Sequence, residues 1–313
     1  SVAEMKSGPA FNKVPHSQLM AVMRRDEALL KEYALRHQVP QTFTNALELI
    51  HHPGIDAIYI ATPPDVHEAY AIEAMRANKF VYVEKPMATT VLACEHMQQV
   101  ANEVNGKLTI AHYRRQLPLF LKVKELLDQD TIGKISEVKI IMHKKAGPKT
   151  YYENNWRVNK ARSGGGLFYD LAPHQLDLVF FYFGDAISYH GRSENKAGLY
   201  PAEDNVQGTM QLDNDIIFNG VWDFTVAAEL EKDVFEIIGE YGQISFPVFG
   251  NDIRIEKSGK QEIIHFDPPL HNQQNFIAQV VSYFLGNGVN PCSTMDALQS
   301  MRVMEAFVYG ANK

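Results

Sequence analysis

The chain has 313 residues, of which 45% are hydrophobic and 21% are charged, an ordinary composition for a globular protein long enough to form two domains. Its net charge of −7 argues against a nucleic-acid or anionic-membrane partner, and no apolar run approaches the ~18 residues that cross a bilayer. Two distant cysteines, Cys94 and Cys292, supply neither a disulfide framework nor a CxxC metal site, so we expect a cytoplasmic protein without a metal.

Between residues 18 and 107, short apolar strands alternate with helical patterns. The predicted strands lie at residues 19–23, 55–61, 80–83 and 107–111. The predicted helices lie at residues 27–37, 46–51, 67–77 and 91–104. This alternation with short connections indicates an α/β domain with a parallel, doubly wound sheet of the Rossmann type.

After about residue 116 the pattern changes to long alternating strands. A helix is expected at residues 119–127, and strands are expected at 135–145, 187–194, 205–213, 216–225, 234–240 and 243–249. Two more helices are expected at residues 274–285 and 295–309. We therefore predict a dinucleotide-binding domain at residues 1–116. Residues 117–313 should form an α+β domain with a large, open, mostly antiparallel sheet.

The apolar run at residues 80–83 ends abruptly in Glu84, Lys85 and Pro86. A charged pair at the carboxyl end of a buried parallel strand lies where open α/β sheets bind ligands. Pro86 fixes its own φ and favours an extended conformation of Lys85, which directs the ammonium group. An isolated Glu-Lys pair could equally be a salt bridge at the end of a strand. The other motifs of the chain therefore determine whether this pair belongs to a functional site.

A second group of polar residues follows a glycine triplet at residues 164–166. If the segment is helical, Asp170, His174 and Asp177 fall on one face at i, i+4 and i+7, although Pro173 suits a first turn or a kink. The alternative is a glycine-rich turn before a helix with one polar stripe. An acid and a histidine beside glycines that admit close backbone approach, together with the Glu-Lys-Pro motif, favour catalysis.

Taken together, these residues resemble the glucose–fructose oxidoreductase/inositol dehydrogenase (Gfo/Idh/MocA) family of nicotinamide-dependent oxidoreductases. The matching motifs run in the family's order over nearly the whole chain: Ala61-Thr62-Pro63-Pro64 with His67, Glu84-Lys85-Pro86, Trp156-Arg157, the glycine triplet with Asp170, His174 and Asp177, and residues 235–246. The resemblance implies a small carbohydrate-like substrate and an open sheet used for oligomer contacts, as a homodimer or homotetramer.

The resemblance also implies roles for individual residues. Lys85, Asp170 and His174 match the family's residues that line the substrate pocket. Cofactor contacts are expected from Arg24, Arg25, Ala61, Thr62, Pro63, Pro64, His67, Glu84 and Lys85. Candidates for the substrate rim are Tyr113, Arg114, Trp156, Arg157 and Asp177, although packing or a surface ion pair would explain each of these as well.

Hydride transfer from a sugar or cyclitol C–H bond to nicotinamide requires removal of the proton of the neighbouring hydroxyl group. Histidine has an unperturbed pKa near ~6.5, which suits a general acid/base at neutral pH, so we favour His174 for this step. Lys85 would hydrogen-bond the reacting oxygen, and Asp170 would orient the imidazole or hold a substrate hydroxyl. Lys85 as the proton acceptor is the open alternative.

The first predicted strand runs into Arg24, Arg25 and Asp26. An acidic residue at this position usually bonds the ribose hydroxyls and disfavours a 2′-phosphate, whereas a guanidinium matches a phosphate with two hydrogen bonds. We therefore predict NADP as the cofactor, with NAD as the alternative. The competing interpretation is an exposed basic turn in which Asp26 caps the next helix.

Two other functions fit the same fold. One is a ligand-sensing binding protein without turnover, and the other is an NAD-dependent glycosidase that oxidises its substrate transiently. One part of the family's pattern is not seen before Ser1, namely an apolar strand followed by a Gly-x-Gly loop. Residues 1–4 resemble the stretch just after that loop, so we expect about a dozen further residues to precede Ser1 in the native protein.

Overall fold

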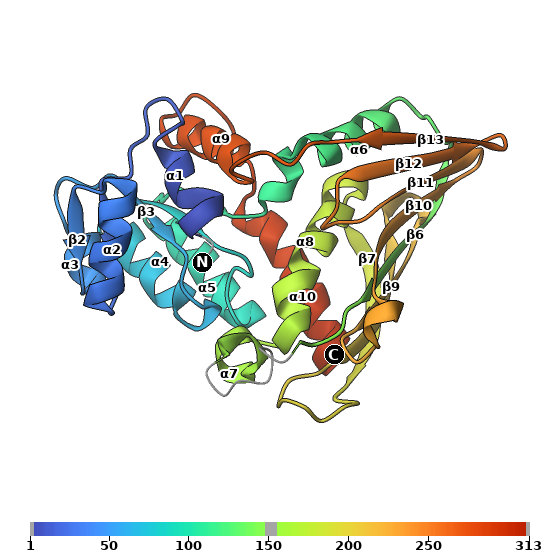
Figure 1. The fold of residues 1–313 in the computed structure, drawn as a ribbon, viewed down its shortest axis with the longest axis horizontal. Helices are drawn as coiled ribbons and strands as arrows, with labels where there is room; N and C mark the ends of the chain where they lie inside the picture. The colour runs from blue at the N-terminus through green and yellow to red at the C-terminus, as the bar shows by residue number, and fades with distance from the viewer. Residues whose placement is uncertain (1–2, 148–154, 311–313) are drawn as a thin grey trace. The chain divides into compact units, whose positions relative to one another are not determined.

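A computed structural model describes residues 3–147 and 155–310 of the chain (Figure 1). The chain forms two compact units. The first contains Ser1–Ala88, Leu92–Arg114 and Pro269–Met295, and the second contains Thr89–Val91, Arg115–Pro268 and Asp296–Lys313. The chain passes into the second unit at Arg115. However, Pro269–Met295 packs with the first unit, whereas the expected division placed it in the second.

The first unit contains two parallel sheets. Strand β1 (Ala21–Met23) pairs with β2 (Gln41–Phe43), and a separate sheet has the order β3 (Ala57–Ile60), β4 (Phe80–Val83), β5 (Leu108–Ile110). The helices of this unit are η1 (Ala3–Ser7), α1 (Gly8–Phe11), α2 (Glu27–His37), α3 (Ala46–Ile50), η2 (Pro64–Val66), α4 (His67–Arg76), α5 (Val91–Glu103) and α9 (Gln274–Phe284). The alternation of parallel strands and helices is the Rossmann-type pattern that the sequence predicts.

Local sequence explains the boundaries of this unit's elements. Helix α2 begins after Asp26, whose carboxylate accepts a hydrogen bond from the amide of Leu29 at 3.0 Å. Strand β4 lies between two neighbours, and its residues Val81 and Val83 are fully buried. By contrast, β1 has one described neighbour, and its three residues are only half-buried rather than fully buried.

The second unit is built on one eight-stranded sheet with the order β13-β12-β11-β10-β6-β9-β8-β7. Its strands are β6 (Ile135–His143), β7 (Ala186–Glu194), β8 (Asn205–Leu212), β9 (Ile217–Asp223), β10 (Lys232–Gly239), β11 (Gly242–Phe246), β12 (Asp252–Lys257) and β13 (Lys260–His265). Neighbouring strands are antiparallel except for β6 and β9, which are parallel. The sheet is therefore large, open and mostly antiparallel, as expected, and β12 and β13 extend it beyond the predicted strands.

Helices cover one face of this sheet, as Figure 1 shows for α8 and α10. The helices of the unit are α6 (Pro118–Asp128), η5 (Trp156–Val158), α7 (Lys160–Ser163), α8 (Gly166–Phe183), η6 (Asp213–Asp215), η7 (Ala228–Leu230) and α10 (Thr294–Tyr309), with η3 (Tyr113–Gln116) where the chain enters it. Gly220, Gly208 and Gly191 lie side by side on three neighbouring strands. A Cβ atom at Gly208 would lie 2.2 Å from the ring of Phe307, so the glycines leave the space that α10 needs to pack.

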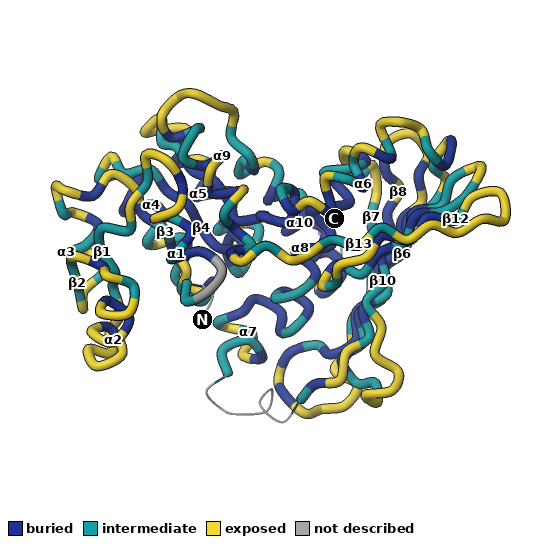
Figure 2. The backbone as a smooth tube through the Cα atoms, turned by 45° about the horizontal axis from the view of Figure 1, so that its top comes forward, coloured by how far each residue is buried: buried dark blue, intermediate teal, exposed yellow. Residues whose placement is uncertain are grey.

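The strands of this sheet alternate between buried and more exposed residues (Figure 2). On the covered face Phe235, Ile140 and Phe218 are almost completely buried. The residues between them in the sequence lie on the opposite face and are half-buried or exposed. No described helix is long and apolar enough to cross a membrane.

Candidate active site

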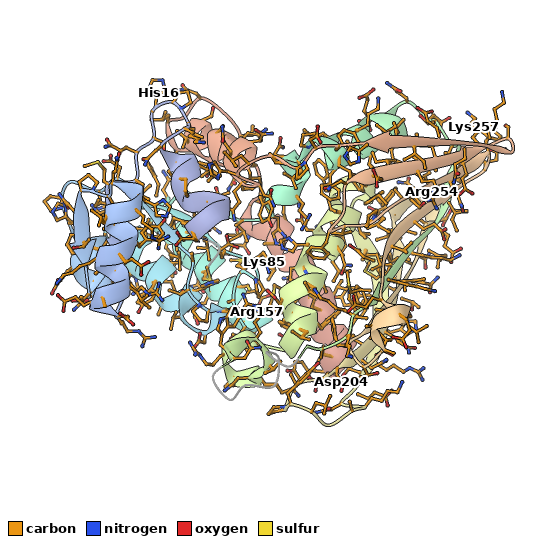
Figure 3. The ribbon with its side chains drawn as sticks, in the orientation of Figure 1. His16, Lys85, Arg157, Asp204, Arg254 and Lys257 are labelled. Carbon is orange, nitrogen blue, oxygen red and sulfur yellow. The ribbon has the colours of Figure 1, made fainter. Side chains whose placement is uncertain are left out.

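Lys85 follows β4, the central strand of the three-stranded sheet, at its carboxyl end (Figure 3). Glu84 still belongs to the ladder, because its amide donates to the carbonyl of Ile60 on β3 at 2.9 Å. Glu84 is 5% exposed, Lys85 is more exposed, and the Lys85–Pro86 peptide bond is cis. The lysine therefore lies at the sheet edge where open α/β folds bind ligands, as the motif predicts.

The loop after β3 lies at the same edge, because β3 and β4 are parallel neighbours. Ala61 is exposed, Thr62 and Pro63 are half-buried, and Pro64 begins the short helix η2. The Thr62 hydroxyl is shielded from solvent and has no hydrogen-bond partner among the described residues. A ligand with polar groups could supply that partner, so this loop fits the dinucleotide that the sequence predicts.

His67 lies in the interior, between the loops that follow β3 and β4. The residue is fully buried, with Nε2 2.9 Å from the carbonyl oxygen of Thr62 and Nδ1 3.1 Å from that of Pro86. Burial lowers the pKa of His67, while these carbonyl oxygens and the Glu84 carboxylate act in the opposite direction. The ring joins the loops that follow β3 and β4, so we revise its expected role from binding cofactor to holding these loops together.

Arg24 and Arg25 follow β1 and are exposed. The amide of Arg24 donates to the carbonyl of Phe43, which fixes the backbone. Asp26 caps α2, as the competing interpretation of this turn states. Neither guanidinium has a hydrogen bond or ion pair within the described part of the chain, so both are free to meet an anionic group.

In the second unit, α8 carries Asp170, His174 and Asp177 at the predicted helical spacing. The helix continues through Pro173, which therefore lies in its interior and not in its first turn. Gly164 has a φ of +89°, and a Cβ atom there would lie 2.7 Å from the ring of Tyr169. The glycine thus allows the chain to turn tightly around Tyr169 into the helix.

Asp170 and two of the predicted rim residues form one cluster. The Arg157 Nε atom donates to the Asp170 carboxylate at 3.0 Å, and the guanidinium lies 4.6 Å from the ring centroid of Trp156. The Arg157 side chain is 41% exposed and that of Asp170 is 23% exposed. The pair combines a carboxylate and a guanidinium next to an aromatic ring, a set suited to holding hydroxyl groups of a polar ligand.

His174 is 5% exposed, and its ring packs edge-on against Phe249, with the centroids 5.8 Å apart. The loop that carries Phe249 is fixed by Asp233, whose carboxylate accepts from the amides of Val248 at 3.0 Å and of Phe249 at 2.6 Å. The sequence reading missed both Phe249 and Asp233. Only the structure links these two residues to His174, because they lie far from the glycine triplet in sequence.

Asp177 does not have the expected position for substrate contact. It is 1% exposed, and both carboxylate oxygens accept hydrogen bonds from Arg115 at 2.7–3.0 Å. Arg115 also donates to Asp296 at 3.1 Å. Removing one partner of such a buried pair typically costs about 3–5 kcal/mol, because the other charge is left unpaired. Asp177 is therefore committed to Arg115 in the interior of the unit.

The other two rim candidates, Tyr113 and Arg114, are also buried, with 2% and 7% exposure. The Arg114 guanidinium lies 5.8 Å from the centroid of the Tyr113 ring. Their burial fits the alternative interpretation, in which both side chains pack in the interior and do not contact substrate.

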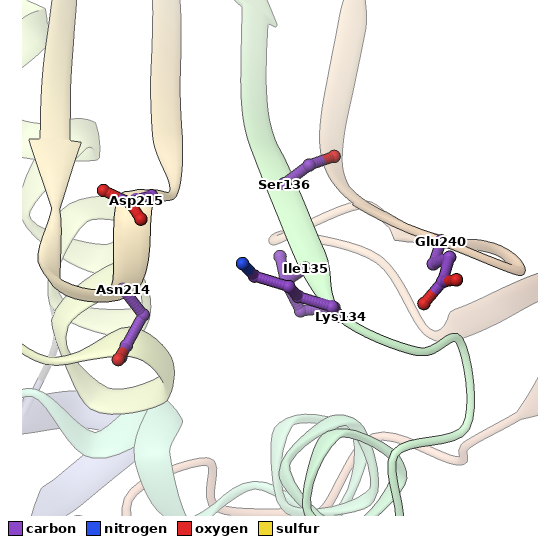
Figure 4. A pocket seen from close by; sticks show the side chains of 6 residues that line it. All are labelled: Lys134, Ile135, Ser136, Asn214, Asp215 and Glu240. Carbon is purple, nitrogen blue, oxygen red and sulfur yellow. The ribbon is translucent and has the colours of Figure 1, made fainter.

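A surface hollow of about 360 Å³ occurs elsewhere on the second unit (Figure 4). Its lining residues are Lys134, Ile135, Ser136, Asn214, Asp215 and Glu240. None of them is an expected site residue, and the lining offers no histidine for proton transfer near neutral pH. We therefore locate the candidate site by its side-chain chemistry and not by this hollow.

Two family profiles together match most of the chain. The profile of an oxidoreductase family with an NAD-binding Rossmann fold matches residues 2–112, and that of the GFO/IDH/MocA C-terminal domain matches residues 120–245. Oxidoreductase P35 of Formosa agariphila is 40% identical over 311 residues, which cover 98% of this chain and 95% of that protein. The chain belongs to the Gfo/Idh/MocA family.

The chain is also similar to a curated dehydrogenase and to a solved dehydrogenase structure. Myo-inositol 2-dehydrogenase of Thermotoga maritima is 25% identical over 249 residues, covering 80% of this chain and 67% of that enzyme. A solved structure of levoglucosan dehydrogenase with NADH and levoglucosan superposes with a TM-score of 0.84 at 19% identity, covering 98% of this chain and 92% of that one. At this identity, the structural likeness shows the fold alone.

Proposed function

We propose that this Gfo/Idh/MocA oxidoreductase transfers a hydride between NADP and a sugar, a cyclitol or a related polyol or keto-sugar. The observation that carries the proposal is the combination of Lys85 at the carboxyl end of β4 with Asp170 and His174 on successive turns of α8. The name of one relative, a myo-inositol dehydrogenase, supports this substrate class.

Each proposed residue has one role in alcohol oxidation. A nicotinamide cofactor, when bound, would supply the hydride acceptor. His174 accepts the proton of the reacting hydroxyl, so that the alcohol becomes a carbonyl group. Lys85 hydrogen-bonds the reacting oxygen as negative charge develops on it. Asp170 and Arg157 hold further substrate hydroxyls, since their ion pair is partly exposed and can exchange one contact for another.

The cofactor prediction rests on Arg24 and Arg25. Both are exposed at the end of β1 without a partner in the described chain, and a guanidinium binds a 2′-phosphate with paired hydrogen bonds. We expect NADPH to bind at least about tenfold more tightly than NADH, and a double Arg24→Ser, Arg25→Ser variant to lose this preference. Titration of cofactor fluorescence measures both dissociation constants. Tighter binding of NADH by the unaltered protein would contradict the prediction.

The function is tested by a screen of sugars, inositols and keto-sugars against oxidised and reduced forms of both cofactors. Absorbance of the reduced nicotinamide reports turnover. Oxidation of a polyol, or reduction of a keto-sugar, supports the proposal. Release of sugar from an aryl glycoside without net cofactor reduction would support a glycosidase, and ligand binding without turnover would support a sensor.

We further propose that the protein forms a homodimer or homotetramer through the uncovered face of the large sheet. Val234, Ile141 and Val221 lie side by side on β10, β6 and β9 and form a half-buried apolar row on that face. A second copy of this face would cover the row. Light scattering at micromolar concentration should give a dimer or tetramer, and Ile141→Glu should shift it towards monomer. Leu121→Glu, on an exposed position of α6, is the control. A monomeric unaltered protein would contradict the proposal.

A further inference from the structure

A buried carboxylate in the first unit is held by residues from distant parts of the sequence. Glu84 Oε1 accepts one hydrogen bond from the Tyr59 hydroxyl at 2.5 Å and another from Gln273 Nε2 at 2.7 Å. Gln273 in turn accepts a hydrogen bond from the Tyr82 hydroxyl at 2.8 Å. Gln273 has no exposed surface and Glu84 has very little, so the network is a fixed part of the interior.

The positions of the donors follow from the sheet. Tyr59 and Tyr82 are register partners on β3 and β4, and their rings stack with centroids 5.0 Å apart. Gln273 immediately precedes α9, where its carbonyl accepts from the amide of Ile277 at 2.8 Å. Burial raises the pKa of Tyr59 and of Tyr82 well above the usual value, and the Glu84 carboxylate adds to this. Both phenols therefore stay protonated and keep donating.

Both donors to the carboxylate use the same oxygen. Glu84 Oε2 has no partner among the residues that the structure describes. A buried carboxylate whose two protein donors share one oxygen keeps acceptor capacity on the other. Glu84 lies at the ligand-binding end of β4, next to Lys85, where a hydroxyl or amide group of a dinucleotide offers the matching donor.

We propose that Tyr59 and Gln273 are positioning residues for cofactor binding. They hold Glu84 Oε1 so that Oε2 is presented to a hydroxyl or amide donor of the nicotinamide half of the cofactor. This inference rests on the proposed function and adds a residue, Gln273, that neither family profile covers, since the profiles match residues 2–112 and 120–245.

Tyr59→Phe is the sharpest test, because it deletes the hydroxyl and keeps the stacked ring. We expect the dissociation constant for NADPH to rise about tenfold and the KM for NADPH to rise with it, because the hydrogen bond lost is to a charged group. The kcat at saturating NADPH should change less than about threefold. Tyr70→Phe is the matched control, since the Tyr70 hydroxyl has no hydrogen bond among the described residues.

A second variant separates positioning from stability. In a Glu84→Gln background, Tyr59→Phe should cause no further loss of NADPH affinity, because both changes act through the same carboxylate. Gln273→Leu should weaken NADPH binding in the same way. A lower melting temperature with an unchanged NADPH dissociation constant at 25 °C in Tyr59→Phe would overturn the inference. An unaltered protein that binds neither NADPH nor NADH would overturn the proposed function itself.

Discussion

Replacement of Lys85 by methionine is expected to lower kcat by about a hundredfold or more while NADPH still binds. Methionine keeps the length of the side chain but removes the ammonium group, so the reacting oxygen loses its cationic hydrogen-bond donor as charge develops. A hundredfold loss corresponds to about 2.7 kcal/mol of transition-state stabilisation. The measurement is steady-state turnover of a substrate from the screen, together with a fluorescence titration of NADPH.

The control for this change is Lys13→Met, which removes an exposed lysine of the same unit that has no ion pair among the described residues. It should leave kcat unchanged. Lys85→Arg keeps the charge but places a planar group at the site. Its kcat should therefore lie between that of the Lys85→Met variant and that of the unaltered protein. Near-normal turnover in Lys85→Met would remove this residue from the mechanism.

The elements with a local signal are predicted well from the sequence. Helix α2 is expected at residues 27–37 and observed there, because Asp26 is a strong N-cap and the helix pattern is continuous. Strand β4 follows from four consecutive apolar residues. Strands β12 and β13 were missed, although their alternating residues flank a turn in which Ser258 and Gly259 have positive φ. That hairpin carried a readable signal.

Other features depend on contacts that no local pattern encodes. Nothing in the sequence of β6 indicates that it pairs in parallel with β9, which lies far along the chain. The return of α9 to the first unit is equally non-local, so Gln273 could not be linked to Glu84 in advance. Such partners cannot be recognised from the sequence, because hydrogen bonds between residues far apart in the chain produce no periodic pattern.

In the candidate site, too, some features follow from local sequence and others depend on distant contacts. Lys85, Asp170 and His174 were selected because of residue type and spacing, and the structure places the last two on one helix, as expected. Asp177 shares that spacing, yet its partner Arg115 makes it part of the interior. Helical spacing determines which residues share a face but not what the face contacts.

His174→Ala is expected to lower kcat by about a hundredfold or more, because general acid/base catalysis by a side chain typically contributes that much or more. The NADPH dissociation constant should change little. His190→Ala is the control, since this exposed histidine on β7 contacts Thr209 and has no proposed role in turnover. The same substrate and cofactor concentrations serve both variants, so kcat values compare directly.

Alanine at residue 174 also removes the ring that packs against Phe249, so a packing role must be separated from proton transfer. His174→Gln keeps a polar side chain of similar length but cannot exchange a proton near neutral pH. If His174 transfers the proton, glutamine should be about as slow as alanine, and neither variant should have a much lower melting temperature than the other. Near-normal turnover in His174→Gln would show that packing against Phe249 is the role of this side chain. The proton acceptor would then have to be another group, with Lys85 as the first alternative to test.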